Sequence, residues 1–245
     1  MDAKPPTGLD LLWGTGDAPP PGPRPHLNPA RIVQAAVELA DTGGLDAVSM
    51  ARIAKRLGFT TMSLYRHVRS KDEILLLMLD SVASVPAELD EPCDDWRLGL
   101  ERWCHAQWAM LRTHAWIVHV PISGPPTTPN QLTWTDRALH TLRDTGLTES
   151  DKAGVVLLVA TYLHTSARMS EGLGDAVSGE SVAAYSKLLG RLVDAERFPA
   201  LRQAVDAGAY DYPADAAEAD RQLDYSFGLD RILDGVEALI WQRAR

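Results

Sequence analysis

Apolar side chains recur at the three-to-four-residue spacing of α-helices along most of this chain beyond residue 27. No stretch alternates apolar and polar residues for long enough to predict a β-strand. The spacing, with its caps and breakers, predicts helices over residues 28–44, 49–58, 60–68, 70–82, 95–113, 131–144, 149–171, 180–194, 198–207 and 216–243. We therefore expect an all-α fold.

The stretch 49–71 has the pattern of two short helices joined by a tight turn. Its apolar positions are Ile53, Ala54, Leu57, Leu64, Tyr65 and Val68. Gly58 permits the turn, and Thr60 is suited to cap the second helix. Six basic residues and no acidic residue lie in the stretch, as a phosphate-binding face requires. A solvated hairpin surface is the alternative, but the order of caps, glycine and apolar spacing favours a helix-turn-helix.

Two longer segments carry a resemblance to a known family. IVQAAVELADTGGLDAVSM (32–50) and IAKRLGFTTMSLYRHVRSKDEIL (53–75) resemble the DNA-binding domain of the TetR/AcrR family of bacterial transcription regulators. FGLDRILDGVEALI (227–240) is similar to the last helix of one subgroup. The resemblance implies an N-terminal three-helix helix-turn-helix domain joined to a larger helical domain for ligand binding and dimerisation.

Three regions are predicted along the chain. Residues 1–27 are rich in proline and glycine, so we expect a flexible arm that either touches DNA or is a dispensable tail. Residues 28–82 form the predicted DNA-binding domain, and residues 83–245 the helical body. Ser70 and Glu73 have the capping-box spacing, and the helix that they start continues into the body as a link between the domains.

The family motif also implies which residues contact DNA. They are Ser49, Thr60, Thr61, Met62, Ser63, Tyr65, Arg66, His67 and Lys71. Most of these map to the groove-facing side of the second helix, whereas Lys71 maps to a phosphate contact and Ser49 lies near the DNA backbone. Tyr65 serves either the core or a phosphate.

Two helices of the body, 149–171 and 216–243, are too apolar for the surface of a monomer. In the family they look like the pair that forms a four-helix bundle across a two-fold axis. A homodimer of this kind carries two reading heads about 34–36 Å apart, which matches a palindromic operator. We therefore expect Leu233 in the seam of the last helix. A large monomer core is the alternative.

The body also holds candidates for a small-molecule site. Five of the seven tryptophans fall between residues 96 and 134, interleaved with polar side chains. Ligand pockets are largely apolar with a few placed polar groups. The candidate ligand-binding residues are Trp103, Gln107, Trp108, Trp134, Tyr162 and His164. Ordinary core packing is the alternative for each of them.

Charge and the remaining motifs narrow the function further. The net charge is −9, but residues 1–80 are balanced and residues 81–245 carry the whole excess, which keeps the body away from a duplex. Cys93 and Cys104 match no metal spacing and are expected to be reduced thiols, with a disulfide as the alternative. No enzyme motif, metal site or cofactor is predicted. Without a membrane-length apolar run or a signal peptide, we expect a cytoplasmic protein.

These observations predict a dimeric, ligand-responsive transcription regulator, most simply a repressor released from a palindromic operator by a small molecule. An activator or a ligand-independent regulator is the alternative within this class. A helical module that binds a protein partner through its acidic body is the alternative from another class.

Overall fold

The computed structural model describes residues 8–14, 27–121, 124–174, 179–211 and 217–245. Its α-helices are α1 (Leu9–Trp13), α2 (Pro29–Gly43), α3 (Met50–Leu57), α4 (Thr61–Leu64), α5 (Lys71–Val82), α6 (Trp96–Thr113), α7 (Pro129–Thr141), α8 (Glu149–Gly174), α9 (Gly179–Leu192), α10 (Pro199–Asp206) and α11 (Ala217–Arg243). Three 3₁₀ turns join them: η1 (Leu45–Ala47), η2 (Ala87–Asp90) and η3 (Ala115–His119). The all-α prediction is confirmed.

The head, formed by α2, α3 and α4, has helix starts that its sequence explains. The side chains of Asn28, Ser49 and Thr60 each accept a hydrogen bond from the backbone N–H three residues later. Ser70 does the same at the start of α5. Such caps satisfy backbone donors that have no partner inside the helix. Gly58 closes α3 with φ of 75°, a left-handed conformation that favours glycine.

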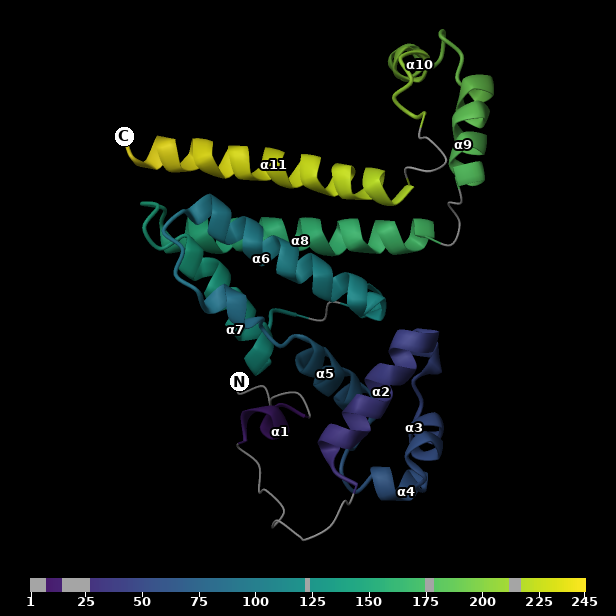
Figure 1. Cartoon of the computed structure of the whole chain (residues 1–245), viewed down its shortest axis with the longest axis vertical. Coiled ribbons are helices and arrows are strands. Elements are labelled where there is room, and N and C mark those ends of the chain that lie inside the picture. The colour runs from purple at the N-terminus through teal and green to yellow at the C-terminus, as the bar shows by residue number, and fades with distance from the viewer. Residues whose placement is uncertain (1–7, 15–26, 122–123, 175–178, 212–216) are drawn as a thin grey trace.

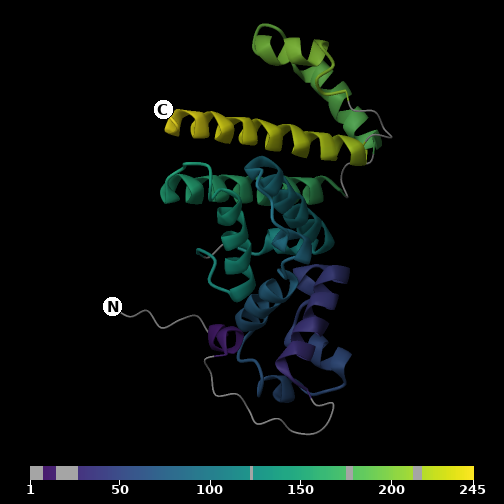
Figure 2. The same cartoon turned by 60° about the vertical axis from the view of Figure 1, so that its left-hand side comes forward.

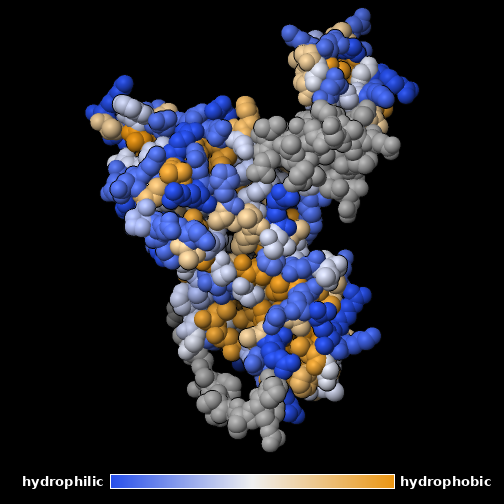
Figure 3. All heavy atoms as spheres, viewed as in Figure 1, coloured by the Kyte–Doolittle hydropathy of each residue, from blue (hydrophilic) through white to orange (hydrophobic). Residues whose placement is uncertain are grey.

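The helices of the body are arranged around two long antiparallel helices, α8 and α11. In both cartoon views α8 and α11 run side by side across the molecule, with α6 and α7 between them and the head (Figures 1 and 2). Helices α9 and α10 pack on each other and project away from the head (Figure 1). The space-filling view shows hydrophobic residues gathered over the head, between hydrophilic outer edges (Figure 3). Within the described residues, no helix is long and apolar enough to cross a membrane.

The N-terminal segment differs in part from the predicted flexible arm. Leu9–Trp13 is a short helix, and Leu9 is buried. Burial beside α5 supplies the apolar contacts that the segment cannot make within itself. Leu27, the last residue of the predicted arm, is also buried, and residues 1–7 and 15–26 lie outside the described residues.

Burial decides between the two options given for Tyr65 and corrects one other prediction. Tyr65 is 48% exposed, unlike the fully buried Leu64 and Val68, so it does not serve the core. Leu233 was expected in a dimer seam, but it is 0% exposed within a single subunit. It belongs to the hydrophobic core of its own subunit, where α11 packs on α8.

Candidate functional site

The outward side of α4 is the first candidate site. Thr60 and Ser63 share a hydrogen bond between their hydroxyl groups at 3.0 Å, which orients both at the start of the helix. Met62 is 71% exposed, so its side chain is accessible to a partner. Regular α-helix ends at Leu64, earlier than predicted. The chain keeps turning to His67, whose N–H bonds to the Leu64 carbonyl at 2.8 Å.

The predicted DNA-contacting residues fall on α4, on the turns beside it and at the starts of α3 and α5. Ser49, Thr61, Ser63 and His67 are half-buried, while Thr60, Met62, Tyr65, Arg66 and Lys71 are exposed. Among the described residues, no carboxylate lies within ion-pair distance of Arg66 or Lys71, so both cations are available to phosphates. Arg56 differs, because its Nε donates to Glu38 at 2.9 Å.

Two of the predicted ligand residues are tied into the core instead. Trp103 on α6 and Trp134 on α7 meet edge to face, with ring centroids 5.8 Å apart. The Trp103 indole N–H donates to the Trp134 carbonyl at 2.8 Å, and the Trp134 indole N–H donates to the Ala83 carbonyl at 2.8 Å. Both indoles are buried and already bonded, so their position favours packing over direct ligand contact.

Other aromatic residues of the body leave polar groups without partners. Trp108 on α6 stacks on Tyr225 of α11, with ring centroids 4.4 Å apart, and the ring of Tyr162 on α8 lies nearly parallel to Tyr225 at 6.3 Å. The Tyr162 hydroxyl donates to the Tyr225 carbonyl at 2.8 Å. Within the described part of the chain, the buried Trp108 Nε1 and Tyr225 hydroxyl have no hydrogen-bond partner. Such groups cost free energy unless a water or a ligand satisfies them.

Sequence reasoning missed Tyr225, because only the crossing of α6, α8 and α11 brings it to Trp108 and Tyr162. The crossing is close at Gly228, where a Cβ atom would lie 2.3 Å from the Tyr162 hydroxyl. A glycine inside the last helix could be recognised in the sequence as a position of close approach, but the sequence did not show that Tyr162 is the residue that approaches it. Gln107 and His164 are both half-buried on their helices. Burial, followed by repulsion from Arg168, lowers the pKa of His164, so this imidazole is neutral at neutral pH.

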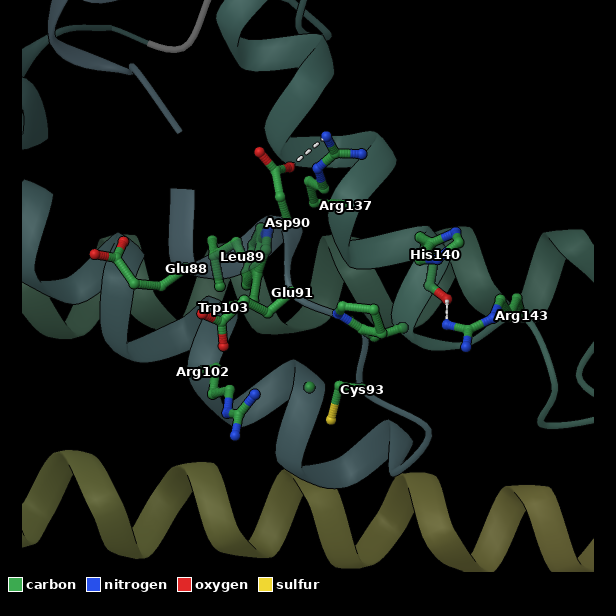
Figure 4. A pocket seen from close by; sticks show the side chains of 13 residues that line it. Glu88, Leu89, Asp90, Glu91, Cys93, Arg102, Trp103, Arg137, His140 and Arg143 are labelled. Carbon is green, nitrogen blue, oxygen red and sulfur yellow. Dashed lines mark hydrogen bonds and ion pairs between the residues drawn. The ribbon is translucent and has the colours of Figure 1, made fainter. Parts of the chain in front are cut away.

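A separate surface cavity of about 260 Å³ opens between η2, α6 and α7 (Figure 4). Charged residues surround an apolar floor that includes Leu89 and Trp103. Arg137 pairs with Asp90 at its mouth, at 2.5 Å. Trp103 is the one predicted ligand residue that lines it, so this cavity and the Trp108–Tyr225 cluster are different places.

The outer face of α8 and α11 is the third candidate surface. A groove of about 560 Å³ runs between them and is lined by Gly154, Leu158, Ile232 and Gly235 among others. Leu157 and Phe227 on the same two helices are 69% and 65% exposed. Large exposed apolar residues on two adjacent long helices suit an interface with another protein chain.

Cysteines and metal ligands add no further site. Cys93 is half-buried, Cys104 is buried, and the two are not joined in a disulfide. Burial, and to a lesser degree the Glu101 charge, raises the pKa of the Cys104 thiol to about 12, which keeps it protonated and inert. Among the residues that the structure describes, no three His, Cys, Asp or Glu side chains are grouped to hold a metal ion.

Comparison with known proteins agrees with both halves of this architecture. Residues 32–78 match the family described as "Bacterial regulatory proteins, tetR family". Residues 88–240 match "Tetracyclin repressor-like, C-terminal domain", which covers more than half of the chain. The chain belongs to the TetR family. As a TetR-family protein it is a helix-turn-helix transcription regulator.

Individual TetR-family relatives align over most of the chain. The HTH-type transcriptional repressor DrrR1 of Streptomyces coeruleorubidus is 36% identical, over 96% of this chain and 86% of DrrR1. The class A tetracycline repressor protein from transposon 1721 of Escherichia coli is 27% identical, over 86% and 90%. The crystal structure of Streptomyces coelicolor ActR in complex with actinorhodin superposes with a TM-score of 0.74 at 27% identity, over 88% of this chain and 99% of ActR.

Proposed function

We propose that this chain is a dimeric repressor that binds a palindromic operator and leaves it when a small molecule enters the helical body. The observation that carries the proposal is the exposed, uncompensated basic face around α4, on a chain whose relatives are named repressors. Its cytoplasmic location and the absence of enzymatic activity stay predictions.

The proposed division of labour on the head follows from exposure and charge. Thr61, Met62 and Ser63 enter the major groove with their hydroxyl and thioether groups, and His67 flanks them. Arg66, Lys71 and the exposed Tyr65 hydroxyl bind phosphates. Phosphate contacts position the head, and base contacts specify the sequence.

A second copy of the chain is the proposed partner of α8 and α11. The exposed Leu157 and Phe227 support this assignment, because a two-fold axis would bury them against the same helices of the partner. Four helices would then form the bundle that joins the two subunits. The two heads would lie on one face of the DNA at two half-sites.

The proposed effector site is the cluster around Trp108, Tyr162 and Tyr225. Stacked aromatic rings favour a planar aromatic ligand, and the unpartnered Trp108 N–H and Tyr225 hydroxyl favour one with oxygen acceptors. The similarity to ActR, which has been crystallised with actinorhodin, supports a small molecule in this half of the chain. Gln107 and His164 stay predicted members of the site. Trp103 and Trp134 are assigned to the core that supports it and not to ligand contact.

The structure offers a route from this site to the head. At the end of α5, the Asp80 carboxylate accepts the backbone N–H of Asn130, at the start of α7, at 2.8 Å. One turn further, the Ala83 carbonyl is held by Trp134, which is held in turn by Trp103 of α6. A ligand that displaces α6 or α7 therefore pulls on α5, and α5 carries the head.

The test is a titration of fluorescent operator duplex with and without effector, using actinorhodin and a panel of other planar aromatic compounds. We expect tight binding that weakens with salt, quenching of tryptophan fluorescence by active compounds, and a roughly 5- to 150-fold loss of operator affinity at a coupling typical of allostery. Quenching without operator release would support a ligand-independent regulator. No binding to any duplex at low salt would contradict the proposal and favour a protein-interaction module.

A further inference from the structure

The N-terminal helix α1 lies across the junction between the head and the body. In both cartoon views α1 lies beside α5, although the two helices are far apart in the sequence (Figures 1 and 2). The Trp13 indole N–H donates to the Thr127 carbonyl at 3.1 Å, across 114 positions of sequence. Thr127 belongs to the loop that leads into α7, so one end of α1 is tied to the body.

The other end of α1 rests on the first turns of α5. Gly8 has φ of +101°, and a Cβ atom there would lie 3.0 Å from Glu73 Cγ and 3.4 Å from Leu76 Cδ2. Only glycine combines this backbone conformation with such a close approach. Leu9, the next residue, is 8% exposed, and Leu12 packs against the main core.

Glu73, on which Gly8 rests, is tied to the DNA-reading turn. Its carboxylate accepts the backbone N–H of Arg69 at 2.5 Å, and Arg69 is two residues beyond His67. Glu73 is only 3% exposed, so the residues packed around it fix the position of its side chain. Gly8 is one of these residues. The contacts therefore run from the body loop through α1 and Glu73 to the end of the DNA-binding motif.

We propose that residues 8–13 form a brace that sets the angle of the DNA-reading head on the body. Hydrogen bonds of Asp80 and Ala83 hold the C-terminal end of α5 to α7, and α1 holds the N-terminal end of α5 to the loop before α7. Two attachments fix a rod where one would leave it free to pivot. This gives the N-terminal segment a role in positioning rather than in touching DNA, and it rests on the proposed operator binding.

The matched variants are Leu9→Asp and Leu11→Asp in the full-length protein. Both add one negative charge to the same short helix, but Leu9 is buried and Leu11 is 45% exposed. If undocking lowers the fraction of correctly oriented heads to about a tenth to a third, operator affinity falls about three- to tenfold in Leu9→Asp. We expect Leu11→Asp to bind like wild type, and the salt slope to be unchanged in both because no phosphate contact is lost.

Hydrogen exchange of the same proteins gives a readout that is independent of DNA. Leu9→Asp should speed exchange of the Arg69 amide, whose acceptor is Glu73, while exchange in α8 and thermal unfolding stay at wild-type values. A smaller effect of the same sign is expected for Trp13→Phe, which removes only the bond to Thr127. Deletion of residues 1–14 replaces Leu9→Asp if that variant does not fold.

The brace would be overturned if Leu9→Asp, or the deletion variant in its place, matched Leu11→Asp in both operator affinity and exchange of the Arg69 amide. Equal losses in both point variants with a shallower salt slope would also overturn it, and would show that the segment touches DNA. A wild-type protein that binds no duplex would refute the proposed function, while Arg69 exchange would still decide whether α1 is a brace.

Discussion

The head and the body both expose large hydrophobic side chains, but on surfaces of different length and charge. On the head, Met62 and Tyr65 stand on a four-residue helix and its following turn, among basic side chains. On the body, Leu157 and Phe227 stand on helices of 26 and 27 residues. A short basic projection suits a DNA groove, and a long apolar ridge suits another protein chain. The kind of partner that an exposed apolar residue contacts can therefore be inferred only together with the charge of its neighbours and the length of its helix.

The largest difference is expected between a charge placed in the core of the subunit, on α11, and one placed on its outer surface, on α8. Leu233→Glu puts a carboxylate at a fully buried position, and an unpaired buried charge costs about 3–5 kcal/mol, so we expect unfolding. Leu157→Glu puts the same charge on the outer ridge, so we expect a folded monomer. Sedimentation and circular dichroism of both variants separate the two outcomes. A Leu157→Glu protein that sediments as the wild-type dimer would remove the outer ridge from the interface.

A second variant tests the close crossing inside the body. Gly228→Ala forces Tyr162 away from the Tyr225 carbonyl, and overpacking of this kind costs about 1–3 kcal/mol. Gly190→Ala on α9 is the matched control, because its new Cβ would meet nothing within 4 Å. Urea unfolding of both proteins measures the difference. Equal stabilities would mean that α8 and α11 are farther apart than this structure shows.

On the head, Lys71→Ala tests whether the basic face acts as a phosphate site. We expect operator and unrelated duplexes to be weakened alike, with a salt slope about one unit shallower, because one phosphate contact is lost. Lys187→Ala on the distant, exposed part of α9 is the control. A loss confined to one base position of the operator would assign Lys71 to base recognition instead.

The smallest expected effect concerns pH and lies in the body alone. The folded protein lowers the pKa of His164, so the unfolded chain binds the proton more readily. Stability from the neutral imidazole is thus complete above the ordinary pKa of about 6.5 and is lost as pH falls below it. His164→Gln should lose less stability than wild type between about pH 7 and pH 5.5. Parallel melting curves for the two proteins across this range would show that His164 is not the titrating group.

Local features were predictable from the sequence, whereas contacts between distant helices were not. On the head, the caps Ser49, Thr60 and Ser70 act on backbone groups three residues away, so local sequence shows them. In the body, Tyr225 meets Trp108 only because separate helices cross, and neither residue's neighbours reveal that contact. Leu233 was placed on the wrong side of α11 for the same reason. Periodicity identifies an apolar stripe but not whether the chain's own core or a partner covers it.

The N-terminal helix is a case in which distant contacts create structure that the local sequence does not predict. Composition predicted an arm without structure, and five residues of it form a helix because α5 and the loop before α7 give them something to pack against. Trp103 and Trp134 likewise joined the ligand prediction by composition, and tertiary hydrogen bonds reveal their place between α5, α6 and α7.

The most direct test of the account is selection of bound duplexes from a random-sequence pool by the purified full-length protein, followed by sequencing. We expect two inverted half-sites whose centres lie about 10–10.5 base pairs, or a multiple of that, apart, because a two-fold dimer presents two α4 helices to one face of the DNA. Enrichment of a single half-site without an inverted partner, or no enrichment at low salt, would contradict it.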